Sequence, residues 1–231
     1  MPLRPLTLRW YYVVDGLCVL AAAASFYMRP SRVSSASSPS EVADSILPSS
    51  PISLDQAPTL GSRTATVAVV MFADFECPFC ARFERDTLPA LRRDYIEPGH
   101  VLFAFRLAPL KIHPMAEATA RAAVCAREQG KFWELTVPLF GHQGESDSGR
   151  LRLAARDAGL AESQFADCLK APSKALDDEV ALGHQLAVYG TPTFFVGRLI
   201  GGDHVRVSGR FEGVRSEAYF RSVIDEVLAG R

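Results

Sequence analysis

Two cysteines separated by two residues are the part of the sequence best suited to chemistry. Cys77 and Cys80 enclose Pro78 and Phe79. Thiols at this spacing can form and exchange a disulfide, or supply half of the ligands of a zinc ion. Zinc would need two further ligands, and the other cysteines and histidines form no second Cys-x-x-Cys or paired-histidine motif. The pattern therefore favours thiol–disulfide chemistry, and we expect neither a metal nor another cofactor.

The neighbouring elements are expected to place Cys77 at the start of a helix. Residues 66–73 form a short apolar, β-branched run, which is typical of a strand covered on both faces. From Pro78 onward, charged and apolar residues interleave at helical spacing. Free backbone N–H groups and the macrodipole at a helix N-terminus stabilise a thiolate and lower the pKa of a cysteine there. Cys77 can then act as the nucleophile, while Cys80, one turn later, resolves the mixed disulfide.

The rest of the chain predicts a thioredoxin-like order of elements. Pro89 should divide or kink the helix that follows the motif. A second strand is expected at 101–107, and a strand at 193–196 should turn at Gly197-Arg198 and resume near Leu199. Helices are expected at 115–128, 131–140, 149–159, 162–169, 173–188 and 216–228. We therefore predict an α/β, thioredoxin-like fold with an all-helical insertion over about 112–188.

The N-terminal part of the chain is expected to lie outside this domain. Arg4 and Arg9 precede an apolar run over residues 10–28, so residues 1–28 are either a cleaved signal peptide or a membrane anchor. Residues 29–58 are rich in serine and proline, which indicates a solvated linker. The globular domain is expected to span 59–231.

Composition excludes a broad electrostatic function. The chain has 25 basic and 26 acidic residues and a formal net charge of −1, so we expect no nucleic-acid partner. With 48% hydrophobic residues the chain can form a packed core.

A second motif, combined with the first, suggests a family. Gly190-Thr191-Pro192-Thr193 precedes the strand at 193–196, and a cis proline there would leave the backbone of Thr191 free to pair with an extended peptide. Together with Asp74-Phe75-Glu76-Cys77-Pro78-Phe79-Cys80 and the stretch 129–134, this motif resembles the DsbA-like branch of the thioredoxin superfamily, which comprises exported thiol–disulfide oxidoreductases. The resemblance covers about 59–230. It implies that Cys77 is the attacking, exposed sulfur, Cys80 its buried partner and Pro192 the cis proline that faces them.

Two residues beside the cysteines depart from that family's strongest oxidant. Phe79 stands where the best-known active site has histidine, and Phe79 can neither carry charge nor donate a hydrogen bond. Glu76 would oppose a thiolate on Cys77 if its side chain lies close. We therefore expect a less depressed pKa and a milder oxidant. Phe79 is also the aromatic residue most expected to be exposed, as an apolar contact for unfolded substrates.

Asp74 has two possible roles. Its carboxylate either handles the proton of Cys80 or serves as a loop carboxylate bonded to backbone N–H groups.

The two remaining cysteines of the domain have two possible states. The resemblance implies a structural disulfide between Cys125 and Cys168, and exported proteins rarely keep spare thiols reduced. The alternative is two buried free thiols.

These observations predict an exported enzyme. We expect a monomeric thiol–disulfide oxidoreductase, periplasmic or otherwise extracytoplasmic, and tethered to the inner membrane if residues 10–28 are retained. Its substrates would be unfolded or partly folded exported proteins, and a membrane or soluble redox partner would reset the dithiol. Oxidase is the first choice and reductase or isomerase the alternative. A tethered peptide-binding protein with structural cysteines is a further alternative.

Overall fold

A six-stranded sheet organises the domain. The computed structural model of the chain describes residues 47–141, 143 and 148–230. The strands lie in the order β1-β6-β5-β3-β4-β2, and β3 pairs parallel with β4 and antiparallel with β5. Their bounds are β1 Ile52–Ser53, β2 Thr59–Leu60, β3 Val67–Ala73, β4 Val101–Leu107, β5 Thr193–Ile200 and β6 His204–Glu212.

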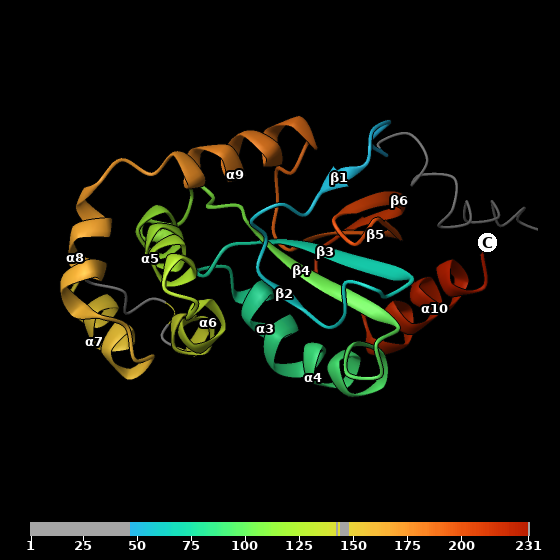
Figure 1. Ribbon diagram of the computed structural model, residues 1–231, viewed down its shortest axis with the longest axis horizontal. Helices are drawn as coiled ribbons and strands as arrows, with labels where there is room; N and C mark the ends of the chain where they lie inside the picture. Colours follow the sequence, from blue (N-terminus) through green and yellow to red (C-terminus); the bar gives the residue numbers. More distant parts are fainter. Residues whose placement is uncertain (1–46, 142, 144–147, 231) are drawn as a thin grey trace, which may run out of the picture. The chain divides into compact units, whose positions relative to one another are not determined.

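Helices cover both faces of this sheet. Figure 1 shows α3, α4 and α10 on one side of the sheet, α9 on the other, and α5 to α8 grouped beyond one end. Their bounds are α3 Pro78–Asp86, α4 Leu88–Leu91, η2 Arg92–Ile96, α5 Ala116–Glu128, α6 Phe132–Gly141, α7 Ser148–Asp157, α8 Glu162–Lys170, α9 Lys174–Gln185 and α10 Glu217–Leu228. The predicted order of strand, helix, strand, helical block, strand pair and helix is confirmed.

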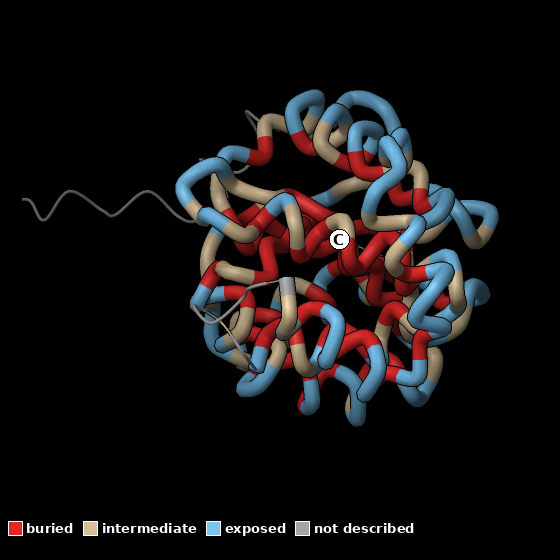
Figure 2. The backbone as a smooth tube through the Cα atoms, turned by 90° about the vertical axis from the view of Figure 1, so that its left-hand side faces the viewer, coloured by how far each residue is buried: buried red, intermediate tan, exposed pale blue. Residues whose placement is uncertain are grey.

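The central strand β3 is buried on both faces, as its continuous apolar sequence predicts. Val67, Val69 and Met71 belong to the core cluster that α3, α5, α6 and α10 complete. Ala68, Val70 and Phe72 belong to a smaller cluster that α9 and the N-terminal strand cover. Figure 2 shows the buried backbone in the interior and exposed residues on the outer turns.

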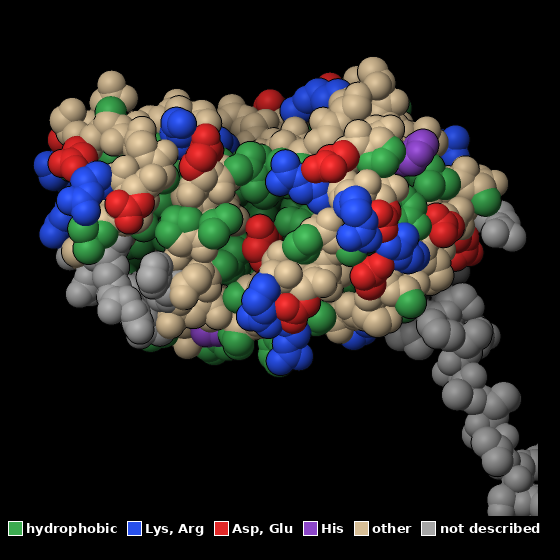
Figure 3. Space-filling view, turned by 90° about the horizontal axis from the view of Figure 1, so that it is seen from below, with side chains coloured by type: hydrophobic (Ala, Val, Ile, Leu, Met, Phe, Trp, Pro, Cys, Tyr) green, Lys and Arg blue, Asp and Glu red, His purple; other side chains and the backbone are tan. Residues whose placement is uncertain are grey.

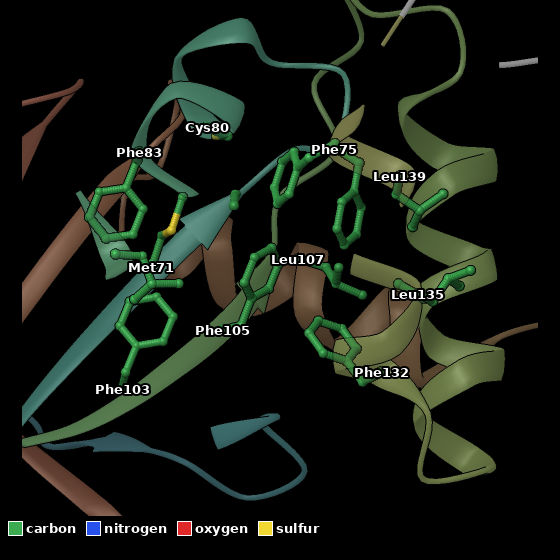
Figure 4. Close-up of a cluster of buried hydrophobic side chains, with 14 of the residues drawn as sticks. Met71, Phe75, Cys80, Phe83, Phe103, Phe105, Leu107, Phe132, Leu135 and Leu139 are labelled. Atoms are coloured by element: carbon green, nitrogen blue, oxygen red, sulfur yellow. The ribbon is translucent and has the colours of Figure 1, made fainter. Parts of the chain in front are cut away.

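Aromatic side chains join the helical insertion to the sheet. Phe75, just beyond β3, stacks on Phe105 of β4 with 5.4 Å between ring centroids, and its ring lies 4.9 Å from that of Phe140 in α6. Figure 4 shows Leu135 and Leu139 of α6 facing these rings, with Cys80 above the end of β3. The insertion therefore packs directly beside the segment that carries the two cysteines.

The course of the last strand pair differs from the prediction. The prediction of a turn at Gly197-Arg198 is wrong, because β5 continues without a break to Ile200. The chain turns at Gly201-Gly202, where φ is positive at both glycines. Gly197 instead lies at a bulge, where a Cβ atom would stand 2.0 Å from the carbonyl oxygen of Arg206. The glycine therefore permits a close approach of β6 rather than a change of direction.

The helical segment that follows the cysteine pair is divided near Pro89, as predicted. Helix α3 ends at Asp86, and Pro89 falls in the first turn of α4, where its missing N–H costs no helical hydrogen bond.

The folded domain begins before residue 59, where the sequence analysis expected it to start. Ile52 pairs with Val205 of β6, and the side chains of Ile52 and Leu54 are buried. The last residues of the serine- and proline-rich segment thus belong to the domain. Residues 1–28, predicted as signal or anchor, lie outside the described residues. None of the helices formed by residues 47–141 and 148–230 has the length and apolarity needed to cross a membrane.

Charges of both signs are interleaved on one face of the domain. On the face seen in Figure 3, acidic and basic side chains stand next to one another, with hydrophobic side chains between them. This distribution agrees with the balanced composition of the chain.

One disulfide and one buried ion pair connect the helices of the insertion, to each other and to the sheet. Cys125 of α5 and Cys168 of α8 form a disulfide, with 5.8 Å between their Cα atoms. On the other side of the insertion, the buried Arg106 of β4 donates to the buried Glu179 of α9 at 2.9 Å. Glu179 also accepts the N–H of Leu107 at 3.3 Å and a hydrogen bond from Arg127 at 3.3 Å.

We predict that Glu179→Ala destabilises the domain by about 3 to 5 kcal/mol, because it leaves the charge of Arg106 buried without its partner. Asp178→Ala is the matched control: Asp178 pairs with Lys174 in an exposed i,i+4 contact, and its loss should cost about 0.5 kcal/mol or less. Urea unfolding measures both. Equal losses in the two variants would contradict this assignment.

Candidate active site

Cys77 stands at the entrance of helix α3. It is the N-cap residue, with extended backbone angles, and Pro78 occupies the first helical position. The carbonyl oxygen of Cys77 accepts the N–H groups of Cys80 at 3.0 Å and Ala81 at 3.2 Å, which begins the helix. The sulfur therefore lies where free N–H groups and the macrodipole favour negative charge.

The turn before β5 faces this helix entrance. The Thr191–Pro192 peptide bond is cis, and the S–H of Cys77 donates to the carbonyl oxygen of Thr191 at 3.2 Å. The two residues are 114 apart in the chain. They meet because β3 and β5 are adjacent antiparallel strands, so the end of β3 and the start of β5 lie at the same edge of the sheet.

Cys77 is more enclosed than expected. Cys77 and Cys80 are free thiols, and their exposed fractions are 3% and 0%. Cys80 is thus buried as predicted, but the expectation that Cys77 is exposed is wrong in this state. The reason is the contact with Thr191, whose backbone covers the sulfur.

The two thiols are electrostatically different. A hydrogen bond from Cys80 is the largest influence on Cys77 and, against the opposing effect of burial, lowers the pKa of Cys77 to about 5. The Thr191 side chain and the backbone N–H groups of Cys80 and Phe79 act in the same direction. Burial raises the pKa of Cys80, and the neighbouring Cys77 raises it further. Cys77 is therefore a thiolate at neutral pH while Cys80 keeps its proton.

The hydroxyl group of Thr191 is well placed to serve this thiolate. Its Oγ1 atom is buried and has no hydrogen-bond partner within the described part of the chain. Because the same side chain lowers the pKa of Cys77, the ionised sulfur is its natural acceptor. A hydroxyl group that lacks a partner in the dithiol state therefore gains one when Cys77 ionises.

Asp74 is a buried carboxylate at the end of β3. Its Oδ1 atom accepts the N–H of Glu76 at 2.9 Å, and its Oδ2 atom accepts the N–H of Leu110 at 2.8 Å. The ring nitrogen Nδ1 of His113 lies 2.8 Å from the same Oδ2 atom. Of the two roles considered, these contacts are those of a loop carboxylate bonded to backbone N–H groups; a role in proton handling stays a prediction.

Glu76 and Gln143 hold the segment before Cys77. Glu76 accepts the N–H of Met115, at the start of α5, so its carboxylate is engaged there. Gln143 donates its amide to the carbonyl oxygens of Phe75 and Cys77, at 2.8 Å each. The sequence marked Glu76 only as an opposing charge. No motif marks Gln143, because its contact depends on how the insertion packs against the segment.

Two aromatic side chains, in the two segments that form the site, face solvent. Phe79 is 49% exposed, as expected, with the guanidinium of Arg82 5.5 Å from its ring centroid. Tyr189, which precedes the cis-proline turn, is 78% exposed. Exposed aromatic rings beside a reactive sulfur are suited to contact apolar side chains of another protein.

No metal-binding cluster accompanies the cysteines in the described residues. Within 47–141, 143 and 148–230, no group of three or more histidine, cysteine, aspartate or glutamate side chains could hold a metal ion.

The comparisons with known proteins agree with this geometry. A family model described as thioredoxin matches residues 53–213, and the chain belongs to this family. Among solved structures, alpha-DsbA1 of Wolbachia pipientis superposes with a TM-score of 0.66 at 22% identity, over 75% of this chain and 92% of that one. The thioredoxin-like fold with a helical insertion, predicted from the order of strands and helices, is confirmed.

Two of the curated relatives differ in kind. The Na⁺/H⁺ antiporter NhaA 3 of Salinispora tropica is 36% identical over 149 residues, which are 63% of this chain and 22% of the antiporter. Disulfide bond formation protein D of Bacillus subtilis is 32% identical over 93 residues, which are 39% of this chain and 41% of that protein. The chain thus spans less than half the length of these two relatives.

We predict that Cys77 titrates with a midpoint near pH 5 in the reduced protein, measured by the ultraviolet absorbance of the thiolate. Thr191→Val should raise the midpoint, because it removes a hydroxyl group that lowers the pKa. A wild-type midpoint near the ordinary thiol value of about 8.5 would contradict the site as described.

The same shift predicts how stability depends on pH. Between about pH 5 and the pKa of an unfolded thiol, about 8.5, the unfolded reduced chain binds a proton at Cys77 that the folded chain does not. The free energy of unfolding of the reduced form, relative to the oxidised form, should therefore rise with pH through this window. Below about pH 5 the contribution is lost. Urea unfolding of both forms at several pH values measures it, and a flat difference would count against the assignment.

Proposed function

We propose that the chain is a thiol–disulfide oxidoreductase that exchanges disulfides with protein substrates through Cys77. The observation that carries this proposal is the asymmetric cysteine pair: the pKa of Cys77 is lowered to about 5 and that of Cys80 is raised, beside a cis-proline turn. A thiolate is both the nucleophile and the leaving group of disulfide exchange. The name of the Bacillus subtilis relative, disulfide bond formation protein D, supports the same chemistry.

The exchange takes place in two displacements. A substrate thiolate attacks the Cys77 sulfur of the Cys77–Cys80 disulfide; a Cys77–substrate bond forms, and the electron pair of the broken bond passes to Cys80, which takes up a proton. A second substrate thiolate then attacks the substrate sulfur, and Cys77 leaves as a thiolate. The substrate gains a disulfide, and the protein is left as a dithiol.

The direction that we propose is oxidation of the substrate. Groups that lower the pKa of Cys77 stabilise the dithiol form, and a stabilised dithiol makes the corresponding disulfide a stronger oxidant. DsbA, which lies at the oxidising extreme, has a cysteine pKa of about 3.5. With a pKa of about 5 for Cys77 and Phe79 in place of a histidine, we propose a milder oxidant.

The substrate surface that we propose joins the cis-proline turn to the exposed aromatic rings. The backbone of Thr191, held beside Cys77 by the cis bond to Pro192, would pair with an extended peptide. Phe79 and Tyr189 would contact apolar side chains of unfolded or partly folded proteins.

The proposal includes an extracytoplasmic location. The basic residues and apolar run within 1–28 support export as a signal peptide or an anchor, and the serine- and proline-rich segment after them supports a spacer. A membrane or soluble redox partner would return the dithiol to a disulfide, and we propose that the enzyme acts as a monomer.

Reduction or isomerisation of disulfides by the same residues is one alternative, and it would show a reducing potential of the Cys77–Cys80 pair. A peptide-binding protein whose cysteines do no redox chemistry is the other alternative. In that case the double variant Cys77→Ser/Cys80→Ser would keep its full biological activity.

We predict that Cys80→Ser accumulates a mixed disulfide with an unfolded, disulfide-containing protein, because Cys77 can attack while no second thiol remains to resolve the product. Non-reducing gel electrophoresis after acid quenching detects the adduct. The matched control is Cys77→Ser, which should form no adduct, since Cys80 is buried and keeps its proton. Adducts in equal amounts from both variants would refute the assigned roles.

A further inference from the structure

A short linker joins the helical insertion to the cis-proline turn. This linker, residues 187–190, leads from the end of α9 to Thr191. The N–H groups of Ala187 and Val188 donate to carbonyl oxygens in the last turn of α9, at 3.1 and 2.8 Å. The two hydrogen bonds form a Schellman motif, in which the chain leaves a helix through one residue of left-handed conformation. The direction in which the linker leaves α9 therefore depends on Ala187.

Ala187 is an unusual residue for this position. Its φ is positive, at 53°, in the region that glycine adopts easily and that residues with a Cβ atom rarely adopt. Helices that end in this motif usually have glycine here. Because alanine does not favour the conformation by itself, contacts with the surrounding structure must select it. The buried side chain of Val188 provides one such contact.

Arg210 of β6 provides a second contact. Its Nη2 atom donates to the carbonyl oxygen of Ala187 at 2.8 Å and to Oε1 of Glu212 at 2.5 Å. The central carbon of its guanidinium group lies 5.7 Å from the ring centroid of Phe195, and the side chain is 9% exposed. Arginine is seldom buried to this extent unless its charge is paired. The guanidinium group is thus enclosed among an aromatic ring, a carboxylate and the linker.

The acidic partner of Arg210 also lies against the linker. A Cβ atom at Gly190 would stand 3.9 Å from Oε2 of Glu212. The Arg210–Glu212 pair therefore meets the linker at both of its ends. Directly after β6, the N–H of Gly213 donates to the carbonyl oxygen of Pro192 at 2.8 Å. The end of β6 thus holds the linker through side chains and the turn through the backbone.

We propose that Arg210 is a positioning residue of the active site, which fixes the linker and so keeps Thr191 against Cys77. Thr191 follows Ala187 by only four residues, and its carbonyl oxygen accepts the S–H of Cys77. A rotation of the backbone at Ala187 would therefore move the groups that act on the sulfur. Arg210 acts through the linker and not on the sulfur itself. The consequence for activity rests on the proposed oxidoreductase function, whereas the consequence for the linker does not.

Hydrogen exchange of the reduced full-length protein, followed by mass spectrometry, tests the effect on the linker. Arg210→Met keeps an unbranched side chain over Phe195 but removes the donors and the charge. We expect faster exchange in peptides that cover residues 187–191 and unchanged exchange in β3 and β4. Arg210→Lys keeps the charge and a donor and should restore slow exchange. Arg206→Met is the matched control, because Arg206 is an exposed arginine on the same strand.

The ultraviolet absorbance of the thiolate tests the effect on Cys77. Arg210→Met should raise the titration midpoint by about one unit, which is a tenfold loss of acidity, because Thr191 then spends less time beside the sulfur. Arg210→Lys and Arg206→Met should match the wild type. Glu212→Gln separates positioning from charge. Removal of an acidic group would by itself favour the thiolate and lower the midpoint, whereas loss of the partner of Arg210 should leave the midpoint unchanged or raise it.

Unchanged exchange of the linker in Arg210→Met would overturn the proposal. Exchange that rises equally in β3 and β4 would overturn it too, because that result would mark a general loss of stability. So would an unchanged Cys77 midpoint in Arg210→Met, or a lowered midpoint in Glu212→Gln. Failure of the oxidoreductase function is a separate result: the reduced wild type would not react with 5,5′-dithiobis(2-nitrobenzoate), while the exchange of the linker would still distinguish the variants.

Discussion

The structure depends on a contact between a helix entrance and a cis-proline turn that are 114 residues apart. Cys77 begins α3, Thr191 belongs to the turn before β5, and the sheet brings both to one edge. The hydroxyl group of Thr191, the thiol of Cys80 and the backbone N–H groups of Phe79 and Cys80 then act on one sulfur. A charge on that sulfur is stabilised by groups that are fixed before any substrate arrives, which is what lowers the pKa of Cys77.

The helical insertion contributes to the site as well as to the size of the domain. Phe75 packs between β4 and α6, Glu76 is held by the start of α5, and Gln143 holds two carbonyl oxygens of the same segment. A bare sheet with flanking helices would leave these carbonyl and carboxylate groups without partners. The insertion thus contacts the segment before Cys77 through aromatic packing and through hydrogen bonds from Met115 and Gln143.

Local signals were enough to predict most of the elements and the cysteine pair. The apolar run of β3, the periodicity of α10 and the Cys-x-x-Cys spacing each lie within a short stretch of sequence. Contacts between distant segments could not be predicted from local signals. The sequence around Gly197 indicates a turn, whereas in the structure β6 passes close to this glycine. The composition around β1 indicates a linker, whereas β1 pairs with β6. The burial of Cys77 and the contacts of His113 and Gln143 belong to the same class, since each joins segments that are between 39 and 114 residues apart in the chain.

The most direct test equilibrates the Cys77–Cys80 pair with glutathione buffers and follows its redox state by alkylation and mass. We predict a single two-electron transition at a potential above that of thioredoxin, about −270 mV, and below that of DsbA, about −120 mV. A potential at or below the thioredoxin value would contradict the stabilised thiolate, and a pair that never equilibrates with glutathione would contradict the exchange activity itself.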